Sequence, residues 1–594
     1  MGRGRPVQVV WTSFFSGLPR GVRVGHAEGM TDCRSGFLPT PQGVLATFAM
    51  LPVSRPLRGI VVLCPPLFEE RKACATVFTA LAQQISANGF GVLRFDPRCT
   101  GESPGAFRDG TVTAWCEDTD AVIAFARRTG VPVILLGIRF GALLAVSALQ
   151  FASVDAIVLW EPIADGAEAL RQAVQRKRVN DMAAFGVSEA SRLDLDTAWD
   201  RGEDVDLDGY LVSAVLRREL LVLSPDPIPS RCPVLLVQIR PGRTADAAAA
   251  RLCPSAERTI CATPSFWSSV GILDVSQPVR EISDWLAMRF DAGQGGLEQG
   301  GHVWDLHFPG SASPESTASG PTVVTLESVR GTPLQAVWLQ PAPAPRLKVL
   351  FLAGWSGCRL GPHNVFVELA RRLEREGIAS LRLDYGGRGD SLGDAAATTI
   401  QSMAEDARTA LQWMRLQDDP EVPCALVAIC SGCKVAVSVA SEEPDLRLLA
   451  LWSPEPMGAL RPSDTNRRKS RSMLHAYVIK ALRRETWSKL LRGGIQGRMV
   501  GRALLRHETR GLGEARIEDA VLAKFPSFQG RILCVFGEGD PEAKGSETAY
   551  SAYFRQHGIS CDRRWIARAG HSFYRSDWAD ALMAQTCDWL KACL

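Results

Sequence analysis

Short apolar runs alternate with segments of helical spacing along most of this 594-residue chain. In residues 366–373, for example, the apolar side chains of Phe366, Leu369, Ala370 and Leu373 share one face of a helix. The apolar runs end in Gly, Pro or Asp, as buried parallel strands do. This alternation predicts an α/β fold in which helices cover a doubly wound, mostly parallel sheet. In such a sheet, functional groups gather at the carboxyl ends of the strands.

The same blocks occur twice in the chain, with a period of about 290 residues. One copy contains F-G-V-L-R-F-D-P-R-C-T-G-E-S from Phe90, and the other contains I-A-S-L-R-L-D-Y-G-G-R-G-D-S from Ile378. Each copy opens with a segment that predicts an antiparallel hairpin, at residues 36–51 and 322–339. The repeat predicts two tandem domains of one fold, and the chain is also too long for a single core.

The expected domain boundaries follow from this repeat. Residues 1–35 lie outside it and are expected to be a disordered leader. The two domains are expected at residues 36–290 and 321–594. Residues 291–320 between them are rich in Gly, Ser, Pro and Thr, which is typical of a linker.

Composition narrows the class of protein. The formal net charge of +3 gives no reason to expect a nucleic-acid partner. Sixteen cysteines are scattered along the chain, many within apolar runs, which favours free thiols in a reducing compartment over a disulfide framework. No apolar run approaches the roughly 18 residues of a membrane span, and the N-terminus does not match a secretory signal peptide. We therefore expect a cytoplasmic protein.

A candidate nucleophile lies in the second copy, in the segment A-I-C-S-G at residues 428–432. α/β-Hydrolases place the nucleophile on a sharp strand-to-helix turn that needs small residues two positions before and after it. Cys430 fits this position, and the start of a helix favours its thiolate. Ser431 is the rival nucleophile, but its flanking residues would be Ile429 and Cys433, which fit the tight turn poorly.

The acid and the base of a triad are expected further along the chain, in that order. Asp540 follows an apolar run in the segment G-E-G-D-P, with Glu538 as the alternative acid. His571 follows the next strand pattern in A-G-H-S-F. Each of these residues alone is common in loops, but their order and positions after strands predict a Cys430–His571–Asp540 triad.

An oxyanion hole needs two backbone N–H donors. The N–H of Ser431 is one expected donor, and the loop G-W-S-G at residues 354–357 should supply the other, from Trp355. Ser356 and His363 are the expected substrate contacts, although a histidine at this position is also typical of loop packing.

The first copy lacks these groups. Its turn reads G-I-R-F-G, and Arg139 cannot act as a nucleophile because it stays protonated. The acid loop at residues 238–243 has no carboxylate, the loop at residues 263–267 reads T-P-S-F-W, and no histidine occurs from residue 32 to residue 300. The first domain is therefore expected to be non-catalytic.

Two roles are open for Arg139. An arginine at the carboxyl edge of a sheet can bind a substrate carboxylate or phosphate. It can equally form a salt bridge with Glu69, Glu70 or Asp96.

A basic helical cap is expected at about residues 457–530 of the second domain. From Arg461 to Arg510 there are 14 Lys and Arg against 3 Asp and Glu. Such a patch attracts an acyl-CoA, an acyl carrier protein, an anionic saccharide or the surface of a membrane. Alternatively, it pairs with the acidic segment at residues 194–208 of the first domain.

Longer motifs resemble one bacterial system. In the second copy, G-C-R-L-G-P-H-N-V-F-V-E-L-A-R and L-R-L-D-Y-G-G-R-G-D-S-L-G resemble the type 1 hydrolase of exosortase A systems. In the first copy, P-P-L-F-E-E-R-K and G-I-R-F-G-A resemble the type 2 hydrolase of the same systems. The resemblance implies a fusion of two α/β-hydrolases in the bacterial cytoplasm, associated with exopolysaccharide production. Ala428, where glycine is usual, and G-W-S-G, where a Gly-Gly-Pro type loop is usual, depart from the family.

The sequence thus predicts a hydrolase or acyltransferase that attacks an ester or thioester through Cys430, without a metal or other cofactor. One alternative is a scaffold or binding protein with two inactive domains. The other is a redox protein, because Cys430 and Cys433 form a C-x-x-C motif at a strand–helix junction.

Overall fold

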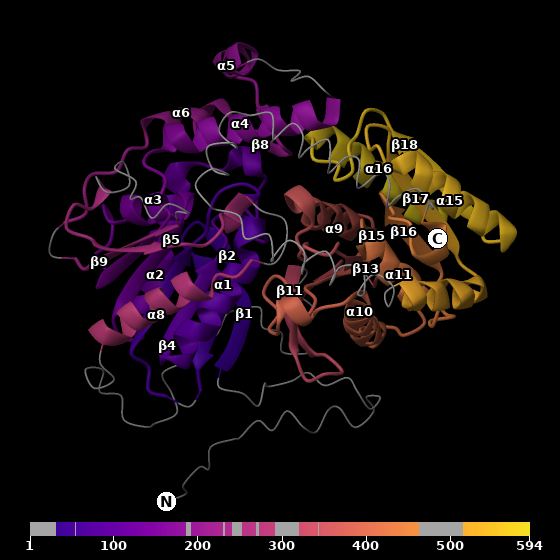
Figure 1. The fold of residues 1–594 in the computed structure, drawn as a ribbon, viewed down its shortest axis with the longest axis horizontal. Helices are drawn as coiled ribbons and strands as arrows, with labels where there is room; N and C mark the ends of the chain where they lie inside the picture. Colours follow the sequence, from indigo (N-terminus) through magenta and orange to yellow (C-terminus); the bar gives the residue numbers. More distant parts are fainter. Residues whose placement is uncertain are drawn as a thin grey trace, which may run out of the picture.

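The chain contains two large sheets that lie side by side, the first coloured indigo to magenta and the second orange to yellow in Figure 1. The structure is a computed structural model. It describes residues 31–53, 55–185, 192–229, 232–239, 252–268, 273–290, 320–342, 344–461 and 515–594.

The first sheet has eight strands in the order β1-β2-β4-β3-β5-β6-β9-β10, and β2 is antiparallel to both of its neighbours. The strands are β1 (Thr31–Thr40), β2 (Gly43–Pro52), β3 (Gly59–Cys64), β4 (Phe90–Phe95), β5 (Val133–Ile138), β6 (Ala156–Trp160), β9 (Val234–Ile239) and β10 (Glu257–Cys261). Its helices are α1 (Glu70–Ala87), α2 (Val112–Arg127), α3 (Phe140–Ala148), α4 (Gly166–Phe185), α5 (Arg192–Asp200), α6 (Ala214–Val222) and α8 (Ser276–Arg289).

The second sheet repeats this order as β11-β12-β14-β13-β15-β16-β17-β18. The strands are β11 (Gly320–Glu327), β12 (Pro333–Gln340), β13 (Leu347–Leu352), β14 (Ile378–Leu383), β15 (Cys424–Ile429), β16 (Leu448–Trp452), β17 (Arg531–Gly537) and β18 (Cys561–Ile566). Its helices are α9 (Val365–Arg375), α10 (Ile400–Arg415), α11 (Gly432–Ala440), α15 (Ala543–Gln556) and α16 (Ser576–Ala592). A separate two-stranded hairpin in the first half joins β7 (Val205–Leu207) and β8 (Tyr210–Val212).

The predicted fold class, two tandem α/β-hydrolase-type sheets, is confirmed by this shared order of mostly parallel strands. Strands β3, β5, β13 and β15 are buried along their whole length, because helices cover both faces of each sheet. The two opening hairpins are also confirmed. The first strand begins at Thr31, inside the expected leader, because its pairing with β2 continues as far as Thr31 opposite Pro52.

Several predicted segments lie outside the described residues. These are most of the leader and the linker, the first copy's acid loop from residue 240 onward, and residues 462–514 of the basic cap. Within the described part of the chain, no helix combines the length and the apolar character needed to cross a bilayer.

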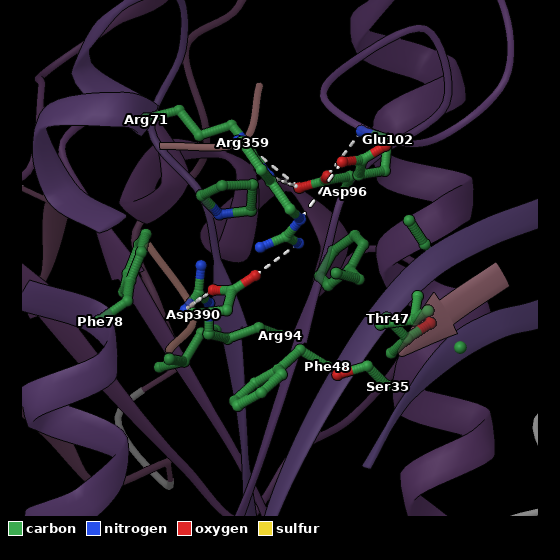
Figure 2. A pocket seen from close by; sticks show the side chains of 16 residues that line it. Ser35, Thr47, Phe48, Arg71, Phe78, Arg94, Asp96, Glu102, Arg359 and Asp390 are labelled. Carbon is green, nitrogen blue, oxygen red and sulfur yellow. Dashed lines mark hydrogen bonds and ion pairs between the residues drawn. The ribbon is translucent and has the colours of Figure 1, made fainter. Parts of the chain in front are cut away.

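The two halves meet through equivalent residues that pair crosswise. Arg94 of β4 lies 2.5 Å from Asp390, and Arg382 of β14 lies 2.7 Å from Glu102. The repeated L-R-F-D…G-E-S and L-R-L-D…G-D-S segments place Arg94 at the position of Arg382, and Glu102 at that of Asp390. Figure 2 shows Arg359 between Glu102 and Asp390, in a pocket that residues of both halves line. Equivalent residues that exchange partners are the mark of a two-fold axis, here an approximate one within a single chain.

Candidate active site

Both halves keep the sharp turn after their fifth strand. The nucleophile positions, Cys430 and Arg139, have φ angles of 57° and 56°, in the left-handed region that non-glycine residues rarely adopt. Each backbone N–H donates to a tryptophan carbonyl at the end of the adjacent strand, at 2.9 Å and 3.0 Å. A Cβ atom added at Gly432 would lie 2.5 Å from the carbonyl oxygen of Leu352, which explains the need for glycine two positions after Cys430.

The structure brings the predicted triad residues together. Cys430 follows β15, Asp540 follows β17 and His571 follows β18, so all three side chains lie at the carboxyl edge of the sheet. His571 Nδ1 is 2.8 Å from Asp540 Oδ2, and a ring nitrogen of His571 lies within 4.8 Å of Cys430 Sγ. The Asp540 carboxylate is almost fully buried, whereas the imidazole is about one-third exposed.

The charges at this cluster favour a protonated imidazole. Burial lowers the pKa of His571, but hydrogen bonds and attraction from Asp540 and Cys430 outweigh it and raise that pKa to about 10. Burial raises the pKa of Asp540, and the hydrogen bond from His571 outweighs it, so that pKa falls below its usual value. The doubly protonated, positively charged form of the His571 imidazole is therefore favoured.

A fourth group, Glu455, was missed by the sequence analysis. The Cys430 Sγ atom donates to Glu455 Oε1 at 3.1 Å, and Lys434 Nζ lies 3.4 Å from Glu455 Oε2. Burial raises the pKa of Glu455, but attraction to Lys434 and the hydrogen bond from Cys430 outweigh this effect. The pKa of Glu455 is therefore below its usual value. The signal was present in the W-S-P-E-P block after β16, since a loop that follows a strand of this sheet reaches the same edge as Cys430.

These side chains include a possible metal-ligand set. Ligand atoms of Cys430, Glu455 and His571 all lie within 4.8 Å of one another, and no other such cluster occurs among the described residues. A thiolate, an imidazole and a carboxylate are ligands that Zn²⁺ accepts. Asp540 Oδ2 lies 2.8 Å from His571 Nδ1, and carboxylates commonly hold a ring nitrogen of zinc-bound histidines in this way.

The expected oxyanion donors lie next to Cys430. Ser431 follows it directly, and the Trp355 backbone N–H donates to the Ser431 hydroxyl at 2.7 Å. Arg388 fixes the other side of this peptide, because its Nε donates to the Trp355 carbonyl at 2.7 Å and its guanidinium lies over the indole. A substrate oxygen must displace the Ser431 hydroxyl to reach the Trp355 N–H. The oxyanion role of both residues stays a prediction.

The two expected substrate contacts lie in different surroundings. Ser356 is exposed beside Trp355. His363 packs against the first half, where its N–H donates to Glu69 Oε1 at 2.8 Å and its ring meets the edge of Tyr210. Burial lowers the pKa of His363, despite the nearby Glu69 carboxylate. These contacts favour the loop-packing role for His363, and substrate contact by either residue stays a prediction.

The C-x-x-C alternative loses support from the surroundings of Cys433. This thiol is buried, donates to the Ala428 carbonyl oxygen at 3.4 Å, and has a pKa that burial raises well above its usual value. All sixteen cysteines lie among the described residues, and none is in a disulfide. A neutral, buried partner thiol is poorly suited to thiol–disulfide exchange.

In the first half, Arg139 is already paired. Its Nε donates to Glu70 at 3.3 Å, and its guanidinium lies 4.7 Å from the centre of the Trp267 ring. Of the three expected ion-pair partners, Glu70 is the one that the structure places there. Trp267 lies in the loop after β10, as His571 lies in the loop after β18. The first half thus has an ion pair and an indole at the edge where the second half has Cys430 and His571.

One protein-family model matches part of the second half. Residues 360–484 match the model of the serine aminopeptidase family S33, a segment that includes Cys430 but neither Asp540 nor His571. No curated protein sequence matches the chain.

Similar solved structures each cover about half of the chain. They include a dienelactone hydrolase from Anabaena variabilis, with 16% identity over 46% of this chain and 99% of that chain and a TM-score of 0.32. A Pyrococcus furiosus esterase has 16% identity over 48% and 94%, with a TM-score of 0.32. Mouse α/β hydrolase domain-containing protein 10 has 17% identity over 46% and 99%, with a TM-score of 0.31. The two halves of this chain share one strand order and one sharp turn after the fifth strand. These features show that both halves have the α/β-hydrolase fold.

Proposed function

We propose that the second half of the chain is a hydrolase for carboxylic esters or thioesters, with Cys430 as nucleophile. The observation that carries this proposal is the cluster in which a His571 ring nitrogen lies within 4.8 Å of Cys430 Sγ and His571 Nδ1 lies 2.8 Å from Asp540 Oδ2. His571 serves as acid and base, and Asp540 orients it.

The reaction has two stages. In the first, the thiol proton of Cys430 moves to His571, and the Sγ thiolate attacks the acyl carbon. The carbonyl electron pair moves to the oxygen, which the N–H groups of Ser431 and Trp355 stabilise. When this intermediate collapses, the bond to the alcohol or thiol breaks, and the leaving group takes the proton of His571. In the second stage, water gives a proton to His571 and attacks the acyl-cysteine, which releases the acid and restores Cys430. An alcohol or thiol in place of water gives acyl transfer.

The wider context is also a proposal. The resemblance to exosortase-associated hydrolases supports a bacterial enzyme linked to exopolysaccharide production, and the free cysteines support a cytoplasmic location. The positive charge of residues 461–510 supports an acyl-CoA or an acyl carrier protein as the acyl donor, although most of this segment lies outside the described residues.

The proposal is tested with a panel of p-nitrophenyl esters and acyl-CoA thioesters. Wild type is compared with Cys430→Ala, Ser431→Ala and, as a control in the first half, Arg139→Ala. We expect Cys430→Ala to abolish turnover. Ser431→Ala should still form the acyl-cysteine, and Arg139→Ala should turn over as wild type does. An active Cys430→Ala variant overturns the assignment. A wild type that turns over nothing, with Cys430 resistant to alkylation at neutral pH, favours the scaffold alternative.

A further inference from the structure

The hairpin of β7 and β8 reaches out of the first half and touches two loops of the second. In Figure 1, β8 and the neighbouring helix α4 lie on the side of the first half that faces α16. A Cβ atom added at Gly209, at the tip of the hairpin, would lie 2.7 Å from the Tyr574 carbonyl oxygen and 2.8 Å from His363 Cβ. The tip therefore fits between these loops only with glycine at this position.

Asp206 joins the hairpin to the helix that follows His571. One carboxylate oxygen accepts from the Gly209 N–H at 2.6 Å, and the other accepts from the Ser576 N–H at 2.6 Å. Ser576 is the first residue of α16, and the side chain of its N-cap residue, Arg575, makes no capping hydrogen bond. An acidic side chain of the first half thus caps a helix of the second, where the helix dipole favours negative charge.

A second contact holds the loop itself. The Tyr574 hydroxyl donates to Asp181 of α4 at 3.4 Å. The ring of Tyr574 lies beside Gly570, since a Cβ atom added there would be 3.6 Å from Tyr574 Cε1. His571 therefore lies in a short loop, between Gly570 and Ser576, that contacts the first half near its far end.

The other loop lies on the oxyanion side of the site. It contains the turn Pro362–Asn364, in which His363 and Asn364 have φ angles of 50° and 62°. Glu69 of the first half accepts from the His363 N–H at 2.8 Å and from the Tyr210 hydroxyl of β8 at 3.0 Å. The hairpin thus stands between the turn that follows the Trp355 loop and the loop that carries His571.

We propose that the non-catalytic first half positions the catalytic histidine of the second, with Asp206 and Gly209 as positioning residues. The inference rests on the proposed function of Cys430 and His571. A displacement of about 1 Å at a reacting group can lower a rate by about a hundredfold. A loop that frays at Ser576 weakens the hydrogen bond between His571 and Asp540, and with it the reaction.

The sharpest test compares two glycines of the first half. Gly209→Ala and Gly202→Ala have matched backbone strain, because the φ angles are 88° and 81°. The Cβ atom meets the second half only at Gly209, since nothing lies within 4 Å of a Cβ atom at Gly202. We expect Gly209→Ala to lower kcat by about ten- to a hundredfold with little change in KM. The fall of its kcat at alkaline pH should move to lower pH in a pH–kcat profile. Gly202→Ala should match wild type.

A second pair of variants tests the carboxylate. Asp206→Ala removes the cap and should lower kcat in the same way, and Asp206→Asn, which keeps an acceptor oxygen, should restore part of it. Glu203→Gln is the control, because Glu203 is exposed and pairs with Arg201 in its own half. Circular dichroism and the thermal midpoint confirm that each variant is folded.

The Nδ1–H proton resonance of His571, observed by NMR with ¹⁵N-labelled histidine, gives a readout that needs no turnover. We expect it to shift or broaden in Gly209→Ala and Asp206→Ala and to stay unchanged in the two controls. If Gly209→Ala matches Gly202→Ala in kcat, alkaline limb and resonance, the positioning role is overturned. Failure of the hydrolase proposal is distinct, because it shows as an inactive wild type or an active Cys430→Ala.

Discussion

At Cys430, two acceptors compete for one thiol proton. Sγ donates to Glu455 Oε1 at 3.1 Å, so in the proposed reaction this proton must leave Glu455 for His571 before Sγ attacks. Lys434, 3.4 Å from the other oxygen of Glu455, offsets part of the charge of this carboxylate.

The pH dependence of turnover should report the hydrogen bond between Asp540 and His571. The raised pKa of His571 means that its proton, and the stabilisation from Asp540, are fully present below pH 6.5 and are lost as the pH rises through about 10. Wild-type kcat should fall on the alkaline side near pH 10. Asp540→Asn should lower kcat by a factor on the order of 10⁴ and move this limb to lower pH. An unmoved limb in a pH–kcat profile would assign it to another group.

Zinc should inhibit the enzyme through the Cys430, Glu455 and His571 cluster. We expect added Zn²⁺ to block turnover and thiol alkylation, and EDTA to restore both, whereas Mg²⁺, which prefers oxygen ligands, should do neither. Glu455→Gln should weaken the inhibition at least about tenfold. Equal inhibition of wild type and Glu455→Gln would show that Zn²⁺ binds elsewhere.

At the scale of elements, the sequence predicted what short-range patterns determine. Both sheets, their opening hairpins and the sharp turn at Cys430 follow from local spacing and small residues. The loops carrying Asp540 and His571 follow from the strands before them. Contacts between elements could not be predicted in this way. The strands of the β7–β8 hairpin have three residues each, too few for a periodic pattern, and Asp206 reaches Ser576 across 370 positions of sequence.

The tip of the hairpin should also respond to pH through Asp208. Burial raises its pKa to about 6, although Lys177, Arg176 and the Asn180 side chain partly offset this effect. The folded state thus disfavours the charged carboxylate, and stability should fall as the pH rises from about 4 to about 6. Asp208→Asn removes the charge and suits the φ angle of 55°. Its thermal midpoint should exceed that of wild type at pH 7.5 and match it near pH 4, and a lower midpoint at pH 7.5 would contradict this.

At the scale of the whole molecule, the crossed ion pairs hold the two halves together. Arg382 and Glu102 are each about 3% exposed or less. Loss of one partner from a buried pair costs about 3–5 kcal/mol, and Arg359, 3.3 Å from Glu102, offsets part of this loss. Arg382→Met should therefore lower the thermal midpoint strongly, and adding Glu102→Gln should recover part of the loss.

The control is Arg408→Met, which breaks an ion pair with Glu442 near the surface and should cost about 1 kcal/mol or less. Calorimetry and limited proteolysis would measure the effects. Similar midpoints for Arg382→Met and Arg408→Met would show that the buried pair contributes little to the association of the halves.

The crossed pairs Arg94–Asp390 and Arg382–Glu102 are of the kind that two identical chains form around a two-fold axis. Identical chains share one gene, so a change from cysteine to arginine at one turn would occur at both and end the chemistry. Joined in one chain, the two turns change independently. Arg139 and Cys430 thus occupy equivalent positions in one molecule. The difference between the two halves is fixed by the sequence and does not depend on a bound ligand.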